Sequence, residues 1–177
     1  MALQTEAELT NSDIQFELAR QDFSYFLSHF VHIMEPPPGR GIIQFELWPH
    51  LISVVSILLN DRLICWLKAR QIGASWVIAA YALWLASYRV GSQVMMFSKS
   101  EDEAKILLSK AKFIWTNLPP ELQTKLGRDN TVEMEFPGNF AAIKAFPSTK
   151  DAGRSLTATL VIMDEADFHE YLDSSYN

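Results

Sequence analysis

The feature that most limits the fold is an uncharged stretch of fifteen residues, 74–88, lying between two short apolar runs. A helix without a polar face must be buried on all sides, and short, continuously apolar runs are typical of strands covered on both faces. The runs RLICWL (62–67) and SQVMMFS (92–98) therefore predict buried strands on either side of a buried helix, and TATLVIM (157–163) predicts another strand. Strands that alternate with helices in this way predict an α/β fold with a mostly parallel sheet.

The remaining segments extend this pattern. Residues 11–33 carry apolar side chains at helical spacing, and Asn11 or Ser12 is suited to cap the start of one or two helices. Three prolines in EPPPGRG (35–41) end that region, because proline cannot continue a helix. The other predicted elements are helices at 47–59, 101–117 and PPELQTKL (119–126), and a hairpin of TVEMEF (131–136) and FAAIKAF (140–146). We therefore predict an N-terminal helical segment, residues 1–40, followed by an α/β domain, residues 41–177.

Charge and cysteine content argue against several classes of protein. The formal net charge of −6 disfavours strong DNA binding by this chain alone, because affinity for DNA comes mainly from Lys and Arg. The single cysteine, Cys65, cannot form an intramolecular disulfide, which fits a reducing compartment, and its position in a predicted buried strand indicates a packing role. Charged residues interrupt every apolar segment before about 18 residues, so we expect no membrane span. The polar start, MALQTEAELT, is unlike a signal peptide.

The stretch WLKARQIGASW (66–76) joins the first predicted strand to the uncharged helix, where glycine-bearing turns bind phosphate. The usual phosphate loop reads G-x-x-x-x-G-K-[ST]. This stretch has Gly73 and Ser75 but an alanine between them, and its lysine, Lys68, stands where the first glycine should be. In a phosphate loop, Gly73 would permit close approach of the backbone, Ser75 would hold Mg²⁺, and Lys68 and Arg70 would supply cations. A solvated loop with Ser75 as a helix cap is the competing interpretation.

A second motif, TLVIMDEAD (159–167), favours the phosphate interpretation. Its apolar residues run directly into Asp164 and Glu165, so a parallel strand would deliver two carboxylates to the carboxyl edge of the sheet, where α/β folds bind ligands. Asp164 would belong to the Mg²⁺ shell, and Glu165 would orient or deprotonate an attacking water. A solvated acidic strand end is the alternative. Two such motifs, each following a buried strand, are the two halves expected of one ATPase.

Two other stretches contain candidate site residues. IIQFELWPHL (42–51) would wrap an adenine base, with Trp48 or Phe45 stacking on it, although aromatic packing at a helix start accounts for these residues equally well. Arg154, in the polar loop KDAGRS (150–155), would reach a phosphate on a neighbouring subunit, or would simply be solvated. The four histidines show no spacing suited to a metal site.

Three stretches together resemble the ATPase domain of the large terminase subunit of tailed bacteriophages, the motor that packs DNA into proheads. They are KARQIGAS (68–75), MMFSKSEDEAKILLSKAKFIW (95–115) and IKAFPSTKDAGRSLTATLVIMDEADF (143–168). The resemblance covers about residues 40–170 and implies a P-loop NTPase-like fold of the ASCE type, with residues 41–177 as an incomplete P-loop ATPase domain. Because the chain stops shortly after Glu165, we expect it to be truncated, without the family's coupling motif or its C-terminal nuclease domain.

The resemblance also implies roles for individual residues. Some members of the family carry the phosphate-loop lysine at the start of the motif, so Lys68 would be a displaced lysine that reaches the β- and γ-phosphates. Asp164 would be the metal-coordinating acid and Glu165 the catalytic one, and Arg154 falls where some members place an arginine that acts in trans around the motor ring. One departure is the adenine motif, which usually has a glutamine soon after its proline, whereas this chain reads W-P-H-L.

The site expected on this basis takes ATP and Mg²⁺ as cofactors. The residues expected to bind the nucleotide are Trp48, Lys68, Ala69, Arg70, Gln71, Ile72, Gly73, Ala74 and Ser75, and the expected metal ligands are Ser75 and Asp164. The family further implies a homo-oligomeric ring, double-stranded DNA, the small terminase subunit and the portal protein as partners, and the bacterial host cytoplasm as the location. No membrane partner is expected.

Two other functions remain open at this point. A helicase-like ATPase is suited to the DEAD sequence after an apolar strand, although SKSEDEAK (98–105) and FPSTKDAGRS (146–155) fit terminases better. A non-catalytic nucleotide-binding or assembly module, left inert by truncation, belongs to a different class. Turnover measured on the chain, with Glu165→Ala as the control, separates a motor from an inert module.

Overall fold

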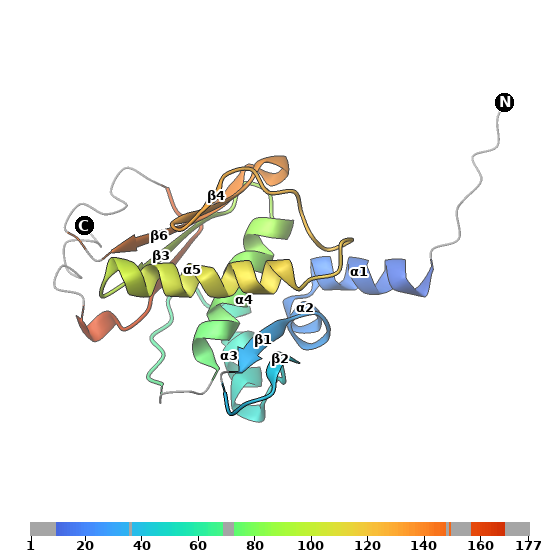
Figure 1. Ribbon diagram of the computed structural model, residues 1–177, viewed down its shortest axis with the longest axis horizontal. Coiled ribbons are helices and arrows are strands. Elements are labelled where there is room, and N and C mark those ends of the chain that lie inside the picture. The colour runs from blue at the N-terminus through green and yellow to red at the C-terminus, as the bar shows by residue number, and fades with distance from the viewer. Residues whose placement is uncertain (1–9, 36, 69–72, 148, 150–156, 169–177) are drawn as a thin grey trace.

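The described part of the chain is built around a five-stranded mixed sheet (Figure 1). The structure is a computed structural model that describes residues 10–35, 37–68, 73–147, 149 and 157–168. Strand β3 pairs in parallel with β6 on one side and with β7 on the other. Strand β5 pairs antiparallel with β6, and β4 pairs antiparallel with β5. In sheet order, the strands are β4 Asp129–Asn130, β5 Glu133–Phe136, β6 Ala141–Pro147, β3 Gln93–Ser98 and β7 Leu160–Met163. The α/β fold that the alternating apolar runs predict is confirmed, but the sheet is mixed rather than mostly parallel, because two of these four pairings are antiparallel.

Two long helices pack against this sheet. Helix α4, Ala74–Tyr88, has the bounds predicted for the uncharged stretch, and α5, Glu101–Thr116, begins directly after β3. Ser100 caps α5 by accepting a hydrogen bond from the backbone N–H of Glu103, and three acids occupy the first turn, where the helix dipole favours negative charge. In Figure 1, α5 runs alongside β6 and β3 and crosses α4. This crossing brings the middle of α5 close to the start of α4.

The N-terminal helices cover the other side of α4. Helix α1, Asn11–Gln21, leads into α2, Phe23–His29. The ring of Phe23 lies edge-on to that of Tyr81, with 5.0 Å between the centroids. The indole N–H of Trp84 donates to the carbonyl of Ala19 at 2.9 Å, deep in the core. At the end of α4, the guanidinium of Arg89 donates to the carbonyl oxygens at the end of α1 and lies 4.2 Å above the Trp84 ring. Helix α4 is therefore enclosed between the N-terminal helices and the sheet layer.

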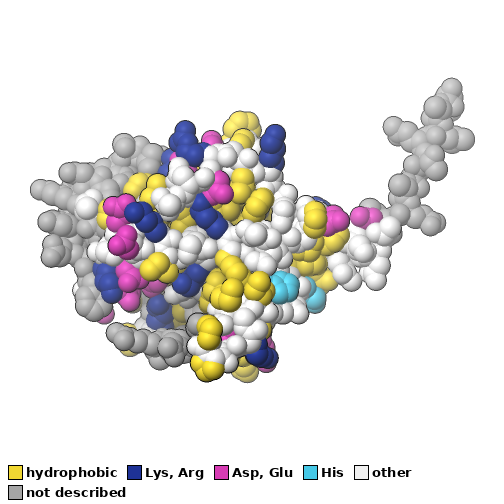
Figure 2. Space-filling view, viewed as in Figure 1, with side chains coloured by type: hydrophobic (Ala, Val, Ile, Leu, Met, Phe, Trp, Pro, Cys, Tyr) yellow, Lys and Arg dark blue, Asp and Glu magenta, His cyan; other side chains and the backbone are white. Residues whose placement is uncertain are grey.

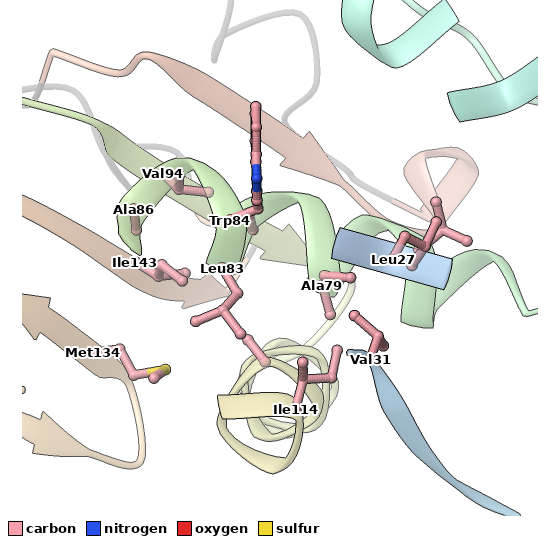
Figure 3. Packing of buried hydrophobic residues seen from close by; sticks show 14 of the residues in the cluster. Leu27, Val31, Ala79, Leu83, Trp84, Ala86, Val94, Ile114, Met134 and Ile143 are labelled. Carbon is pink, nitrogen blue, oxygen red and sulfur yellow. The ribbon is translucent and has the colours of Figure 1, made fainter. Parts of the chain in front are cut away.

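One continuous core joins these parts. Figure 3 shows side chains of α2, α4 and α5 meeting those of three strands, among them Leu27, Leu83, Ile114, Val94, Met134 and Ile143. All six side chains are buried. Because α4 is apolar on every side, it contributes core residues to both of its neighbouring layers, which is the arrangement expected of a helix without a polar face.

A hairpin and a short helix lie between α2 and the candidate phosphate turn. Strands β1, His32–Glu35, and β2, Gly41–Gln44, pair antiparallel around the proline-rich segment, and α3, Pro49–Asn60, follows. The sequence predicts α3 closely. Pro49 lies in its first turn, where a backbone N–H has no acceptor within the helix, so proline loses no hydrogen bond there. It does not predict the hairpin, because the prolines indicate only that the helical region ends.

Three predictions of local structure are wrong. The segment 62–67 is not a strand: Leu63 and Leu67 are 82% and 96% exposed, and Cys65 is exposed rather than packed in a buried strand. An apolar run forms a strand only where another strand offers it hydrogen bonds. Among the described residues, segment 62–67 has no such neighbour, because the edge strand β7 pairs with β3 alone. PPELQTKL (119–126) forms turns rather than a helix.

The third error concerns the cap of α1. Thr10, not Asn11 or Ser12, is the N-cap, and it exchanges hydrogen bonds with Asp13 in a reciprocal capping box. The carboxylate three residues after the threonine decides which of several capping residues starts the helix.

Candidate functional site

The strand ends at one edge of the sheet bring the predicted acids together with the start of α4. Parallel pairing of β3 with β7 sets Phe97 opposite Met163, and the backbone N–H of Asp164 donates to the carbonyl of Phe97 at 3.0 Å. Asp164 is thus the first residue beyond β7, held in place by the adjacent strand. The carboxyl edge of a parallel sheet is the usual position of ligand sites in α/β folds.

An ion pair connects the two predicted motifs. The ammonium nitrogen (Nζ) of Lys68 lies 2.8 Å from Oδ1 of Asp164, and the hydroxyl of Ser75 donates to Oδ2 of the same carboxylate at 3.4 Å. The Lys68 and Asp164 side chains are 27% and 16% exposed, so the pair is only partly screened by water. Lys68, Ser75 and Asp164 thus converge from two segments that are far apart in the chain.

Gly73 forms the turn that starts α4. Its φ of 79° is left-handed, a conformation that glycine adopts without the steric cost of a side chain. The N-cap residue Gly73 has no side chain to cap α4, so among the described residues the first N–H groups of the helix lack the acceptor that a serine or aspartate cap would supply. The rings and methyl groups of Phe45 and Leu51 lie beneath the glycine, 3.6 Å from the position that a Cβ atom would take. The start of a helix favours negative charge, so this position is suited to an anion.

Glu165 has a partner that the sequence did not reveal. Its carboxylate Oε2 lies 2.8 Å from Nζ of Lys99, and both side chains are partly exposed. Because Phe97 pairs with Met163 in register, the residues two positions further on, Lys99 and Glu165, leave the sheet on the same side. Glu165 also has a left-handed backbone, with φ of 54°, which is uncommon for a residue with a side chain and concentrates at functional sites.

The structure brings together part of the predicted site. Lys68, Gly73, Ala74, Ser75 and Asp164 lie at one place, with Glu165 following directly on Asp164. Ala69, Arg70, Gln71, Ile72 and Arg154 lie outside the described residues, so their roles stay predictions.

The two predicted adenine-stacking residues have different environments. Phe45 is buried beneath Gly73, so packing accounts for it. Trp48 is exposed, and its ring contacts His50 at 5.6 Å between centroids. Within the described part of the chain, no hydrogen bond, ion pair or ring contact connects Trp48 to Lys68 or Asp164.

The donor atoms at this site suit a magnesium ion. Mg²⁺ prefers oxygen ligands and usually takes one or two from protein, with water and phosphate oxygens completing its shell. The Ser75 hydroxyl and the Asp164 carboxylate are two such oxygens, already adjacent. Among the described residues, no group of three or more His, Cys, Asp or Glu side chains could hold a metal ion by itself. In the same residues, no helix is long and apolar enough to cross a membrane.

Comparison with known proteins gives two findings. The model of a family described as "Terminase large subunit, T4likevirus-type, N-terminal" matches residues 65–176, a range that includes every candidate site residue except the two aromatic candidates Phe45 and Trp48. Among solved structures, the crystal structure of the HK97 bacteriophage large terminase matches 81% of the chain with a TM-score of 0.63 at 16% sequence identity, and the match spans 30% of that protein. At this identity the structural likeness shows the fold alone. No curated protein matches the chain by sequence.

Proposed function

The chain belongs to the family of N-terminal regions of T4-like terminase large subunits, and we propose that it is an ATP-binding and ATP-hydrolysing motor domain of the P-loop type, in the ASCE group. The observation that carries the proposal is the convergence of Lys68, Ser75 and Asp164 at the uncapped start of α4. A cation, a hydroxyl and a carboxylate beside free helix N–H groups are the parts that hold a magnesium-bound triphosphate.

In this proposal, the start of α4 and Lys68 bind the phosphate groups. The N–H groups after Gly73 donate to phosphate oxygens, and Lys68 adds a charge-assisted contact to them from the other side of the turn. Asp164 pairs with Lys68 at 2.8 Å, so in this proposal the phosphate groups compete with Asp164 for the Lys68 ammonium. Residues 69–72 of the loop contribute further contacts.

Asp164 and Glu165 divide the remaining work between them. Ser75 and Asp164 would hold Mg²⁺, which supplies neutralisation of charge on the phosphate oxygens when it is bound. Glu165 orients a water for attack on the terminal phosphate and accepts a proton from it. Trp48 would contact the base, and Arg154 would stabilise transition-state charge on a neighbouring subunit.

The whole motor would be larger than this chain. In the full protein, we propose that copies form a homo-oligomeric ring that moves double-stranded DNA into proheads with the small terminase subunit and the portal protein, in the host cytoplasm. The net charge of −6 indicates that other parts of the assembly supply much of the affinity for DNA.

Calorimetric titration of the chain with Mg-ATP tests the proposal through Lys68. Lys68→Ala removes one charge-assisted phosphate contact, which contributes roughly 1.5–3 kcal/mol, so affinity should fall about tenfold or more. Lys144→Ala is a matched control, because Lys144 also pairs with a mostly buried carboxylate, Glu133, at 3.3 Å, but does so on β6. The control should leave affinity within about twofold of the original chain.

Equal affinity in the original chain and Lys68→Ala would refute the role of the displaced lysine. Phosphate release from ATP, with Glu165→Ala as the inactive reference, then decides between a motor and an inert nucleotide-binding module. Binding without any Glu165-dependent release would leave this chain as the module.

A further inference from the structure

Lys110 differs from its neighbouring lysines on α5. Lys105 pairs with Glu101 at 2.6 Å along the helix, and Lys112 bonds to Asp129 across to β4. Lys110 is half-buried, yet its ammonium has no ion-pair partner among the residues that the structure describes. Basic and acidic side chains are interspersed on the face of the molecule that Figure 2 shows. A partly desolvated cation without a carboxylate partner is an unfavourable arrangement that needs an explanation.

The position of Lys110 supplies one. Its ammonium nitrogen (Nζ) lies 5.5 Å from the centre of the Trp76 ring. Trp76 is in the first turn of α4 and follows Ser75 in the sequence. Phe113, one turn further along α5, meets the same ring edge-on at 5.7 Å between centroids. The crossing of α4 and α5 therefore places Lys110 beside the N-terminal end of α4, next to the candidate phosphate turn.

The charges of the site act on this lysine. Burial lowers the pKa of the Lys110 ammonium, while the carboxylate of Asp164 opposes that shift and the ammonium of Lys68 adds to it. Both members of the ion pair thus lie close enough to Lys110 to affect its protonation. Glu103, on the same helix, also raises the pKa, but less than Asp164 does. Perturbation by both burial and a specific charge, in a group beside a candidate site, is typical of functional residues.

We propose that Lys110 is a third phosphate-binding cation of the nucleotide site, contributed by α5 and absent from the loop motif. This inference rests on the proposed function, because it needs the triphosphate at the start of α4. Lys68 is already paired with Asp164, so an arriving polyphosphate meets Lys110 as a cation that no carboxylate of the described residues pairs with. The bound phosphates then provide a direct counter-charge at this position.

Two ligands and three variants test the role of Lys110. Calorimetric titrations use Mg-ATP and Mg-tripolyphosphate, which carries the phosphate chain without the nucleoside. Lys110→Met keeps an unbranched apolar stem over Trp76 but removes the charge. It should lower the affinity for both ligands about tenfold or more. Lys110→Arg should retain affinity within about threefold. Lys105→Met, on the same helix, should change it less than twofold.

Thermal unfolding of the ligand-free variants separates a binding role from a structural one. Because Met removes an unpaired, partly buried charge, Lys110→Met should melt at the same temperature as the original chain or higher. A lower melting temperature with no rescue of binding by Lys110→Arg would make Lys110 a structural residue and overturn the inference.

The outcomes also separate the inference from the function beneath it. If Lys68→Ala weakens Mg-ATP and Lys110→Met binds it normally, the inference fails and the nucleotide site stands. If the original chain binds neither ligand, the nucleotide site and the inference fail together. If Lys110→Met lowers the affinity for Mg-ATP but not for Mg-tripolyphosphate, the assignment of Lys110 to the phosphates is overturned.

Discussion

Replacing Gly73 by alanine tests the turn on which the candidate site depends. The substitution adds one methyl group to a backbone with φ of 79°. That methyl would lie 3.6 Å from the side chains of Leu51 and Phe45, which is an ordinary contact, so the cost comes from the left-handed conformation and not from a clash. For a residue with a Cβ atom, this conformation costs about 1–2 kcal/mol. In a domain of this size, such a loss lowers the melting temperature by roughly 2–8 °C.

Gly91 provides the matched control, because its φ is 78° and nothing lies within 4 Å of the position that its Cβ atom would take. Gly91 follows α4 at the opposite end from Gly73. Gly91→Ala should therefore lower the melting temperature by a similar amount, measured by circular dichroism. If the proposed site is right, only Gly73→Ala should also weaken the binding of Mg-ATP, because it alone distorts the N–H groups proposed to bind the phosphates. A Gly73→Ala chain with unchanged stability and unchanged affinity would refute both the strained turn and its role.

Three further predictions address the acids and the core. Glu165→Gln should leave Mg-ATP affinity within about twofold and abolish phosphate release, whereas Asp164→Asn should weaken the Mg²⁺-dependent part of binding; equal weakening by both would show that the roles are assigned wrongly. Lys99→Ala breaks an ion pair whose two side chains are both 40% exposed, so urea unfolding should show a loss below about 1 kcal/mol, and a larger loss would mean that the pair supports the fold. Trp84→Phe leaves the buried carbonyl of Ala19 without its donor, and urea unfolding should report a loss of about 1–3 kcal/mol; an unchanged midpoint would contradict the importance of this bond.

Some parts of the fold follow from the sequence because one physical requirement determines them. The absence of charge over 74–88 leaves burial on all sides as the only stable arrangement, and α4 has those bounds. The acids of α5 and its capping Ser100 define the start of that helix in the same way. For the site, the apolar run ending at Asp164 indicates a parallel strand that delivers the acids to the sheet edge, and the ion pair with Lys68 agrees with that placement.

Other parts depend on contacts that a pattern does not contain. The apolar run at 62–67 shows only that the segment is suited to burial, and strand formation needs a neighbour whose hydrogen bonds are available. Lys99 could have been found only from the register that places it level with Glu165, and Lys110 only from the crossing of α4 and α5. Lysines near acids on a helix are usually solvated, so their sequence gives no signal. The assignments of residues 69–72 and Arg154 fall outside the described residues.

Helix α4 links the site to the order in which the protein unfolds. Its apolar surface is covered on one side by α2 and on the other by α5 and the sheet, and its end is tied to the carbonyl oxygens of Arg20 and Gln21. Detaching α1 and α2 would expose a helix with no side that water can solvate. Loss of the N-terminal helices and loss of the turn at Gly73 are therefore one cooperative event. The turn at Gly73 is therefore only as stable as the whole helical layer that supports it.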